Sequence, residues 1–207
     1  DEAMVLSLSF VDGHVREVAY ERDGHLSTVS AENVVLSAGA YHSPQVLTLS
    51  VIGPERELKR LGIKPVNVLN GVGENYQDHA TVQMTFEGKG DFDPDWVVPR
   101  FRLMYKSDSA MPSGNFHIFM RPPTVVPGLK TMMPVSANLL ELRFPGRLTL
   151  KNSDPHELPE IEDAMLEHPD DIAAMKTAME FIYELVSHES MQDYYGPLLS
   201  PGLEEDW

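Results

Sequence analysis

The densest group of polar side chains in this sequence is Asn75, Gln77, Asp78 and His79. Carboxamide, carboxylate and imidazole groups this close together can hydrogen-bond a bound cofactor. The same residues are equally suited to a hydrogen-bonded loop in which Asp78 caps or turns the backbone. Their spacing by itself leaves both interpretations open.

A second candidate is the run of small residues Ser37-Ala38-Gly39-Ala40, which follows the apolar segment 34–36. That segment lacks polar alternation, which is typical of a short strand covered on both faces, and cofactors bind at the carboxyl ends of such strands. Ser43 and Pro44 are suited to be the N-cap and the first turn of a following helix. A tight strand-to-helix turn is the simpler interpretation of these residues taken alone.

Other chemistry has little support in the sequence. The 8 histidines include no His-x-x-x-His spacing, so we expect no metal site. The absence of cysteine excludes disulfides and thiolate nucleophiles. Gly71-x-Gly73 lacks the third glycine of a dinucleotide loop. His117 sits on an expected strand and faces away from its apolar neighbours, so it either lines a pocket or, as we favour, is an ordinary strand histidine.

The composition predicts a soluble globular chain of one or two domains, with 207 residues of which 42% are hydrophobic and with no long apolar span. The 16 basic and 32 acidic residues give a formal charge of −16. Such a charge repels nucleic acids and anionic membrane surfaces, so we expect neither as a partner. Localisation stays open, with the cytoplasm only a default.

The first part of the chain reads as a β-meander followed by two helices. Alternating residues and the Asp12-Gly13 and Asp23-Gly24 turns predict three antiparallel strands within residues 6–30. A buried strand at 34–36 is expected next. Helices are then expected from Ser43 to Gly53 and from Pro54 to Gly62.

The second part reads as an antiparallel sheet with one covering helix. Strands are expected at 82–86, 116–120, 137–143 and 147–151, and apolar residues at helical spacing predict a helix over 169–188. No element is assigned to residues 196–207. The predicted fold class is therefore α+β, with one domain at 1–79 and another at 80–207.

Three ordered motifs are similar to the glucose-methanol-choline (GMC) oxidoreductases, a family that includes choline dehydrogenases. The segment from Gly39 to Pro54 resembles the second signature of the family. The run from Gly71 to His79 resembles the segment that follows it, and residues 146–161 resemble the hairpin of the substrate domain. Two departures stand out, namely Val51 where the family usually has Gly and Phe144-Pro145 where it has Ser-Arg.

The resemblance implies a partial FAD-binding domain joined to a partial substrate domain. It implies cofactor contacts at the residues that match the family's flavin-side positions, which are Val5, Ala38, Gly39, Asn75, Gln77, Asp78 and His79. For Val5 an ordinary strand valine is an equally good interpretation. No catalytic residue is assigned, because the family's histidine base belongs to a motif that this sequence does not contain. Without the family's Gly-x-Gly-x-x-Gly turn, we expect the isolated chain to be inactive and its own FAD binding to be doubtful.

The predicted function is that of a central piece of an FAD-dependent enzyme that oxidises a primary or secondary alcohol by hydride transfer to flavin. Two alternatives stay open. One is a flavin-containing lyase on the same scaffold, and the other is a non-catalytic truncated module. For the truncated module, loss of the partner domain should expose the apolar segments 34–36 and 46–52, which predicts self-association.

Overall fold

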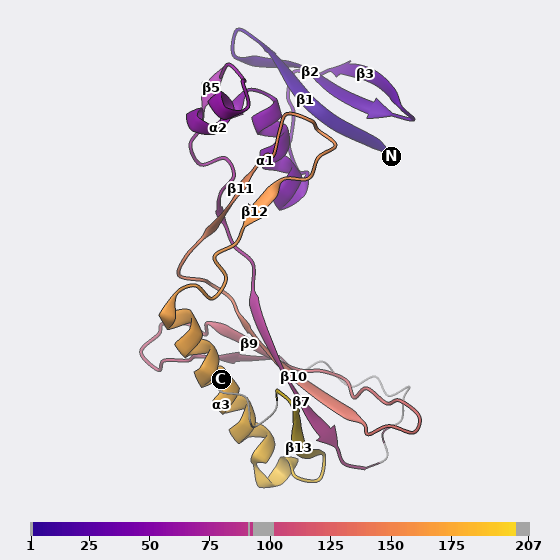
Figure 1. Cartoon of the computed structure of the whole chain (residues 1–207), viewed down its shortest axis with the longest axis vertical. Coiled ribbons are helices and arrows are strands. Elements are labelled where there is room, and N and C mark those ends of the chain that lie inside the picture. Colours follow the sequence, from indigo (N-terminus) through magenta and orange to yellow (C-terminus); the bar gives the residue numbers. More distant parts are fainter. Residues whose placement is uncertain (1, 91, 93–101, 202–207) are drawn as a thin grey trace. The chain divides into compact units, whose positions relative to one another are not determined.

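The computed structural model describes residues 2–90, 92 and 102–201. The chain forms two compact units (Figure 1): the first comprises 1–77 and 145–163, and the second 78–144 and 164–207. The functional division predicted at residue 79 stays a prediction. What the structure adds is that the hairpin at 145–163 returns to pack with the N-terminal part of the chain.

The first unit contains two helices and eight strands in the part that the structure describes. Their bounds are β1 Ala3–Val11, β2 His14–Arg22, β3 His25–Ser30, α1 Gly39–Leu49, β4 Ile52–Gly53, α2 Glu55–Arg60, β5 Asn67–Val68, β6 Glu74–Tyr76, β11 Gly146–Thr149 and β12 Glu160–Glu162. Strands β1, β2 and β3 form one antiparallel sheet, β12, β11 and β6 a second, and β4 pairs with β5 in parallel.

The predicted meander is confirmed, with both turns where the sequence places them. Asp12 and Gly13 have φ of 51° and 76°, and Asp23 and Gly24 have φ of 52° and 74°. Two successive positive φ values define the type I′ turn that matches the twist of a hairpin. The meander is tied to α1 because Ser50 Oγ accepts a hydrogen bond of 2.7 Å from Leu8 N–H.

The expected buried strand at 34–36 is wrong. Residues 33–37 form no strand, and Val35 is 88% exposed. A strand exists only through a ladder of hydrogen bonds to a neighbour, and no described segment pairs with this one. Of the apolar residues expected to drive self-association, Val46 is buried and Val35 is exposed. Self-association itself stays a prediction.

Helix α1 begins four residues earlier than expected. It starts at Gly39, so Ser43 is not its N-cap and Pro44 lies inside it. Instead, Ser43 Oγ accepts a hydrogen bond of 3.0 Å from Ala38 N–H, just before the helix. The helix also ends at Leu49 rather than near Gly53. The second helix is confirmed as α2, with Leu58 fully buried.

The end of α1 places Val51 at φ +65°, the position where glycine commonly follows a helix. A β-branched residue is strained in this region, so Val51→Gly should raise the free energy of unfolding by about 1 kcal/mol net of the entropy that glycine adds. Urea unfolding followed by circular dichroism measures the change. Val66→Gly is the matched control, because Val66 is 58% exposed, and it should destabilise. If the parent protein had a higher free energy of unfolding than Val51→Gly, Val51 would not be strained.

The second unit is built on a five-stranded antiparallel sheet in the order β13-β7-β10-β9-β8. Its elements are β7 Ala80–Gly88, β8 Arg102–Tyr105, β9 Phe116–Met120, β10 Met132–Leu139, α3 Pro169–Ser187, the 3-10 turn η1 Glu189–Met191 and β13 Tyr195–Ser200. These elements confirm the α+β class with an antiparallel sheet and a covering helix.

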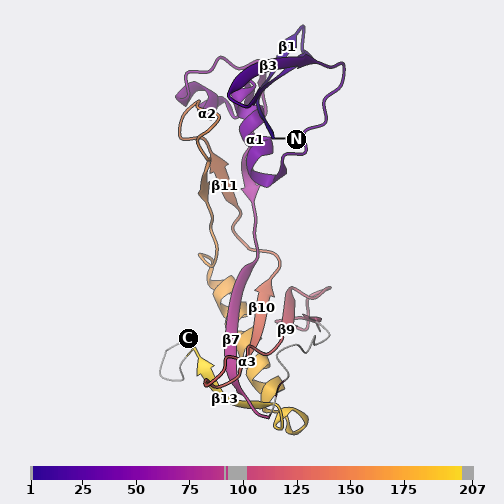
Figure 2. The same cartoon turned by 90° about the vertical axis from the view of Figure 1, so that its right-hand side faces the viewer.

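Helix α3 lies against one face of this sheet (Figure 2), where it buries the apolar side of each strand. Met84, Phe116 and Val135 from three strands are fully buried there, as is Ile182 from the helix. The helix starts as predicted after residue 168, with His168 Nδ1 accepting a hydrogen bond from Asp170 N–H. Asp170 and Asp171 occupy its first turn, where the helix dipole favours negative charge.

Three strand predictions in this region need correction. The strand expected at 137–143 runs from 132 to 139. Its first half was missed because proline has no N–H for the hydrogen bonds of a central strand, and yet Pro134 lies within this one. The strand expected at 147–151 is β11, which belongs to the first unit. The tail to which no element was assigned contains β13, whose irregular pairing with β7 hides the period of a strand.

Candidate functional site

The candidate site lies at the start of α1. Gly39 has φ +83°, and the position of its absent Cβ is open, with no described heavy atom within 4 Å. In the described part of the chain, no side chain caps the helix start and its first turn carries no acidic residue. The first-turn N–H groups of a helix have no partner within the helix, so this end presents hydrogen-bond donors and a partial positive charge.

A cavity of about 270 Å³ adjoins this helix start. It is lined by residues of α1, of the segment around β6 and of β11, namely Ala40, Pro44, Gly73, Glu74, Asn75, Tyr76, Gln77 and Leu148. Pro44 has no N–H to donate to the carbonyl of Ala40 four residues earlier. The proline therefore removes one hydrogen bond between successive turns of the helix beside the cavity.

Gly73 lines this cavity and lets the chain before β6 pack closely against Leu148. Its φ is +82°, and a Cβ at this position would overlap the carbonyl oxygen of Leu148. The same close approach lets Leu148 N–H donate a hydrogen bond of 2.6 Å to the Gly73 carbonyl. Glycine is thus needed here for packing against β11, a role that the sequence analysis did not predict.

Two of the predicted cofactor residues, Asn75 and Gln77, lie together on the cavity wall. Asn75 adopts φ +60°, a conformation that asparagine tolerates better than most residues. Gln77 Nε2 lies 3.5 Å from Asn75 Oδ1. Sequence reasoning missed two further residues: the hydroxyls of Tyr41 and Tyr76 are 3.2 Å apart, with ring centroids 6.0 Å apart. No signal in the sequence indicated that Tyr41 and Tyr76 are in contact, because they lie on separate elements 35 residues apart.

Ala38 and Gly39 lie at the start of α1, and the other three predicted residues, Val5, Asp78 and His79, lie elsewhere. Val5 is on β1 opposite Tyr20, 38% exposed and outside the cavity lining. Asp78 and His79 belong to the second unit. There Asp78 Oδ1 accepts a hydrogen bond of 2.7 Å from His79 N–H, which is the backbone-turning role that the loop interpretation gave it. A cofactor role for all seven residues stays a prediction.

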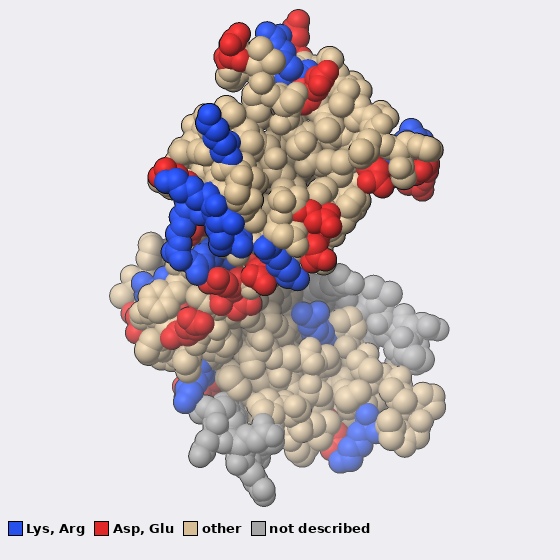
Figure 3. Space-filling model, turned by 45° about the horizontal axis from the view of Figure 1, so that its top comes forward, with Lys and Arg blue, Asp and Glu red and all other residues tan. Residues whose placement is uncertain are grey.

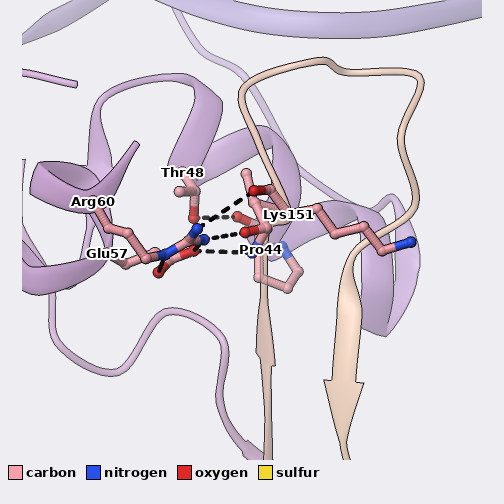
Figure 4. Close-up of polar contacts among 6 residues, drawn as sticks. Pro44, Thr48, Glu57, Arg60 and Lys151 are labelled. Atoms are coloured by element: carbon pink, nitrogen blue, oxygen red, sulfur yellow. Dashed lines mark hydrogen bonds and ion pairs between the residues drawn. The ribbon is translucent and has the colours of Figure 1, made fainter. Parts of the chain in front are cut away.

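Helix α2 holds β11 in place through Glu57 and Arg60 (Figure 4). Glu57 Oε1 accepts hydrogen bonds from Leu150 N–H at 2.9 Å and from Arg60 at 2.7 Å. Arg60 also donates to the carbonyls of Leu150 and Lys151. Partial burial raises the pKa of Glu57, but the hydrogen bonds from Arg60 and Leu150 and the positive charges of Arg60 and Arg147 outweigh it and lower the pKa below 4.5. This contact connects residues 90 or more positions apart.

Because the folded-state pKa of Glu57 is depressed, its contribution to stability is full above pH 4.5 and is lost as the pH falls through the folded-state pKa. We expect Glu57→Gln to lower the free energy of unfolding at pH 7 by about 1–3 kcal/mol, with the difference shrinking in acid. Urea unfolding at several pH values tests this. Glu55→Gln is the control, since its pair with Lys59 is exposed and should be worth little. A difference that grows in acid would contradict the assignment.

Other charges of the first unit are paired in the same way. Arg147 contacts Glu162 at 2.6 Å, and Lys151 lies 3.8 Å from Glu157. Figure 3 shows basic and acidic side chains next to one another on the face in view. The strong negative net charge therefore does not prevent local pairing around the hairpin.

Gln45 fixes the loop of the hairpin to α1. This side chain is 3% exposed, and its Nε2 donates to the carbonyls of Pro155 and Glu157 at 3.1 and 2.9 Å. Its Oε1 pairs with His42 Nδ1 at 2.8 Å. The glutamine of the Ser-Pro-Gln sequence thus has a structural role next to the candidate site.

The second unit presents a polar sheet face opposite α3. The register places Thr81, Asn138 and His117 side by side on it, with Gln83, Ser136, Phe119 and Arg102 in the next row. Arg121 Nε donates to Ser136 Oγ at 3.1 Å, and its guanidinium lies 5.9 Å from the Phe119 ring centroid. Burial and the nearby Arg102 and His79 lower the pKa of His117, which favours its neutral imidazole.

Neither a metal cluster nor a membrane helix is found in the described residues. No group of three His, Cys, Asp or Glu side chains there is placed to hold a metal ion. No described helix is both long and apolar enough to cross a membrane.

Comparison with known proteins gives consistent matches. Residues 9–81 match the family model described as GMC oxidoreductase. The oxygen-dependent choline dehydrogenase of Staphylococcus haemolyticus (strain JCSC1435) is 29% identical over 229 residues, which cover 97% of this chain and 40% of the relative. The chain thus spans less than half the length of that curated relative.

Solved structures share the fold. A formate oxidase matches with a TM-score of 0.84 at 22% identity, covering 96% of this chain and 45% of that one. The pyridoxine 4-oxidase from Mesorbium loti matches with a TM-score of 0.82 at 18% identity, covering 99% and 42%. At these identities the likeness supports the fold alone.

Proposed function

Since the chain belongs to the GMC oxidoreductase family, we propose that it serves in an FAD-dependent enzyme that oxidises a primary or secondary alcohol to the carbonyl compound. In this reaction the alcohol carbon loses a hydride and its hydroxyl loses a proton. FAD supplies the two-electron acceptor for that hydride when it is bound. The observation that carries the proposal is the uncapped start of α1 beside a cavity lined by Asn75 and Gln77.

The residues at this site fit a flavin nucleotide. Such a cofactor carries ring carbonyls and a diphosphate that accept hydrogen bonds, and the start of α1 offers backbone donors and positive dipole charge. Gly39 leaves open space there, so the backbone can approach a flat ring closely. Ala38, Gly39, Asn75 and Gln77 are the residues that would hold the cofactor on this side.

The second unit would supply the substrate side. Its sheet presents hydrogen-bonding side chains on the face opposite α3, including Thr81, Asn138 and His117. Side chains on adjacent strands of a sheet keep fixed spacings, so such a face orients a small molecule well. No histidine of this chain is assigned as the base that takes the hydroxyl proton.

The test is to express the complete gene product and record its visible spectrum. The proposal predicts a yellow protein with flavin absorption that bleaches when an alcohol is added without oxygen. A colourless protein that takes up no FAD contradicts it and favours the non-catalytic module. A flavin that stays oxidised while the protein cleaves its substrate supports the lyase instead. We expect the 207-residue chain by itself to oxidise no alcohol.

A further inference from the structure

The polar face of the five-stranded sheet carries positive charge. Arg102 lies on β8 and Arg121 follows β9, and the register and contacts place both on this face. His117 lies between them in sequence, and Arg102 is close enough to influence its titration. Both arginines are exposed. In the described chain, neither forms an ion pair with a carboxylate.

Negative charge is almost missing from the same face. Among the described sheet residues, Glu87 at the end of β7 is its one carboxylate, and it pairs with Lys130 at 2.6 Å. This distribution is notable because the chain as a whole has a formal charge of −16. Acidic residues are twice as numerous as basic ones in the chain, but they are nearly absent from this face of the described sheet.

A second observation on this face is a buried acceptor without a donor. Asn138 Oδ1 is buried and has no hydrogen-bond partner among the described residues. Asn138 stands between Thr81 and His117 across the sheet. A buried oxygen without a donor is unfavourable, so a ligand that donates a hydroxyl hydrogen there is favoured.

From this pattern we propose that the enzyme prefers an alcohol that carries an anionic group, such as a small hydroxycarboxylate, over a cationic alcohol such as choline. The guanidinium groups of Arg102 and Arg121 attract the anion, and Asn138 Oδ1 accepts a hydrogen bond from the hydroxyl. Guanidinium groups match carboxylates in charge and in the geometry of their donors. A quaternary ammonium group would meet two like charges instead. This inference rests on the proposed function, because it assigns the substrate side to this sheet.

The first test needs no FAD. The 207-residue chain is titrated at constant ionic strength with butyrate or with tetramethylammonium, while the His117 resonance is followed by NMR and assigned with His117→Gln. We expect a saturable shift with butyrate and none with tetramethylammonium. Arg102→Gln should weaken the butyrate effect about tenfold. Lys176→Gln, which removes one positive charge from α3 on the other side of the sheet, should leave it unchanged.

The second test uses the complete holoenzyme with 4-hydroxybutyrate, 1-pentanol and choline, which are similar in size and differ in charge. We expect kcat/KM to fall in that order, and Arg102→Gln to lower it about tenfold for 4-hydroxybutyrate while changing it less than twofold for 1-pentanol. Choline as the best of the three, or no saturable butyrate shift in the chain, overturns the anionic preference. If the complete protein contains no flavin, the proposed function is wrong. The butyrate titration still decides whether this face binds anions.

Discussion

Replacing Gly39 with alanine is expected to lower the affinity of the complete protein for FAD by about tenfold or more, which corresponds to about 1.4 kcal/mol. The methyl group would enter the open space at the start of α1, where we propose that the backbone approaches the cofactor. Alanine is also disfavoured at φ +83°, so the helix start would shift. The ratio of flavin to protein absorbance after gel filtration, and FAD titration of the apoprotein, measure the loss.

A matched control separates cofactor binding from backbone strain. Gly13 in the first meander turn has φ +76°, and the position of its absent Cβ is equally open. Gly13→Ala therefore introduces the same kind of strain away from the cavity. If both variants lose flavin to the same degree, the loss reflects folding and Gly39 has no special part in holding FAD.

Local signals in the sequence predicted the elements that local chemistry decides. The hairpins of the meander follow from two Asp-Gly pairs, because the positive φ values of a type I′ turn are available to these residues at low cost. Helix α3 follows from apolar residues at helical spacing and two acidic residues at its start. In both cases the residues that determine the element lie within it.

Elements that depend on distant partners were predicted poorly. Residues 34–36 have the composition of a buried strand, but composition cannot supply the neighbouring strand. The start of α1 was misplaced because Ser43 bonds Ala38 rather than capping the helix. The hairpin at 145–163 joins the first unit through Gln45 and Glu57, which contact it across about a hundred residues of chain, and no local pattern reports such contacts.

The same distinction between local and distant determinants applies to the residues of the candidate site. The family resemblance selected Asn75 and Gln77, which the structure brings together with Ala40 on one cavity wall. It could not select Tyr41 and Tyr76, whose contact depends on how α1 and β6 pack. The polar cluster that seemed continuous in the sequence is divided after Gln77 between two units. Consecutive residues of this cluster therefore belong to different packing units.

Packing between β6 and β11 leads to the prediction with the largest effect on the fold. Gly73→Ala is expected to lower the free energy of unfolding by about 2–4 kcal/mol, from the strain of a positive φ and from overpacking against the Leu148 carbonyl. The clash is between a Cβ, whose position the backbone fixes, and a backbone oxygen, so side-chain rotation cannot relieve it. The midpoint of thermal unfolding should fall by about 10 °C or more.

Gly71 provides the control for this substitution because it lies two residues away, in open space and without a positive φ. Gly71→Ala should leave the unfolding midpoint within about 2 °C of the parent, since a surface change without strain alters stability by less than about 0.5 kcal/mol. Equal unfolding midpoints for the two variants would show that the approach of Gly73 to Leu148 is not needed. The position of β11 would then depend mainly on the contacts that Glu57, Arg60 and Gln45 make with the hairpin, and Glu57→Gln should lower stability more than Gly73→Ala does.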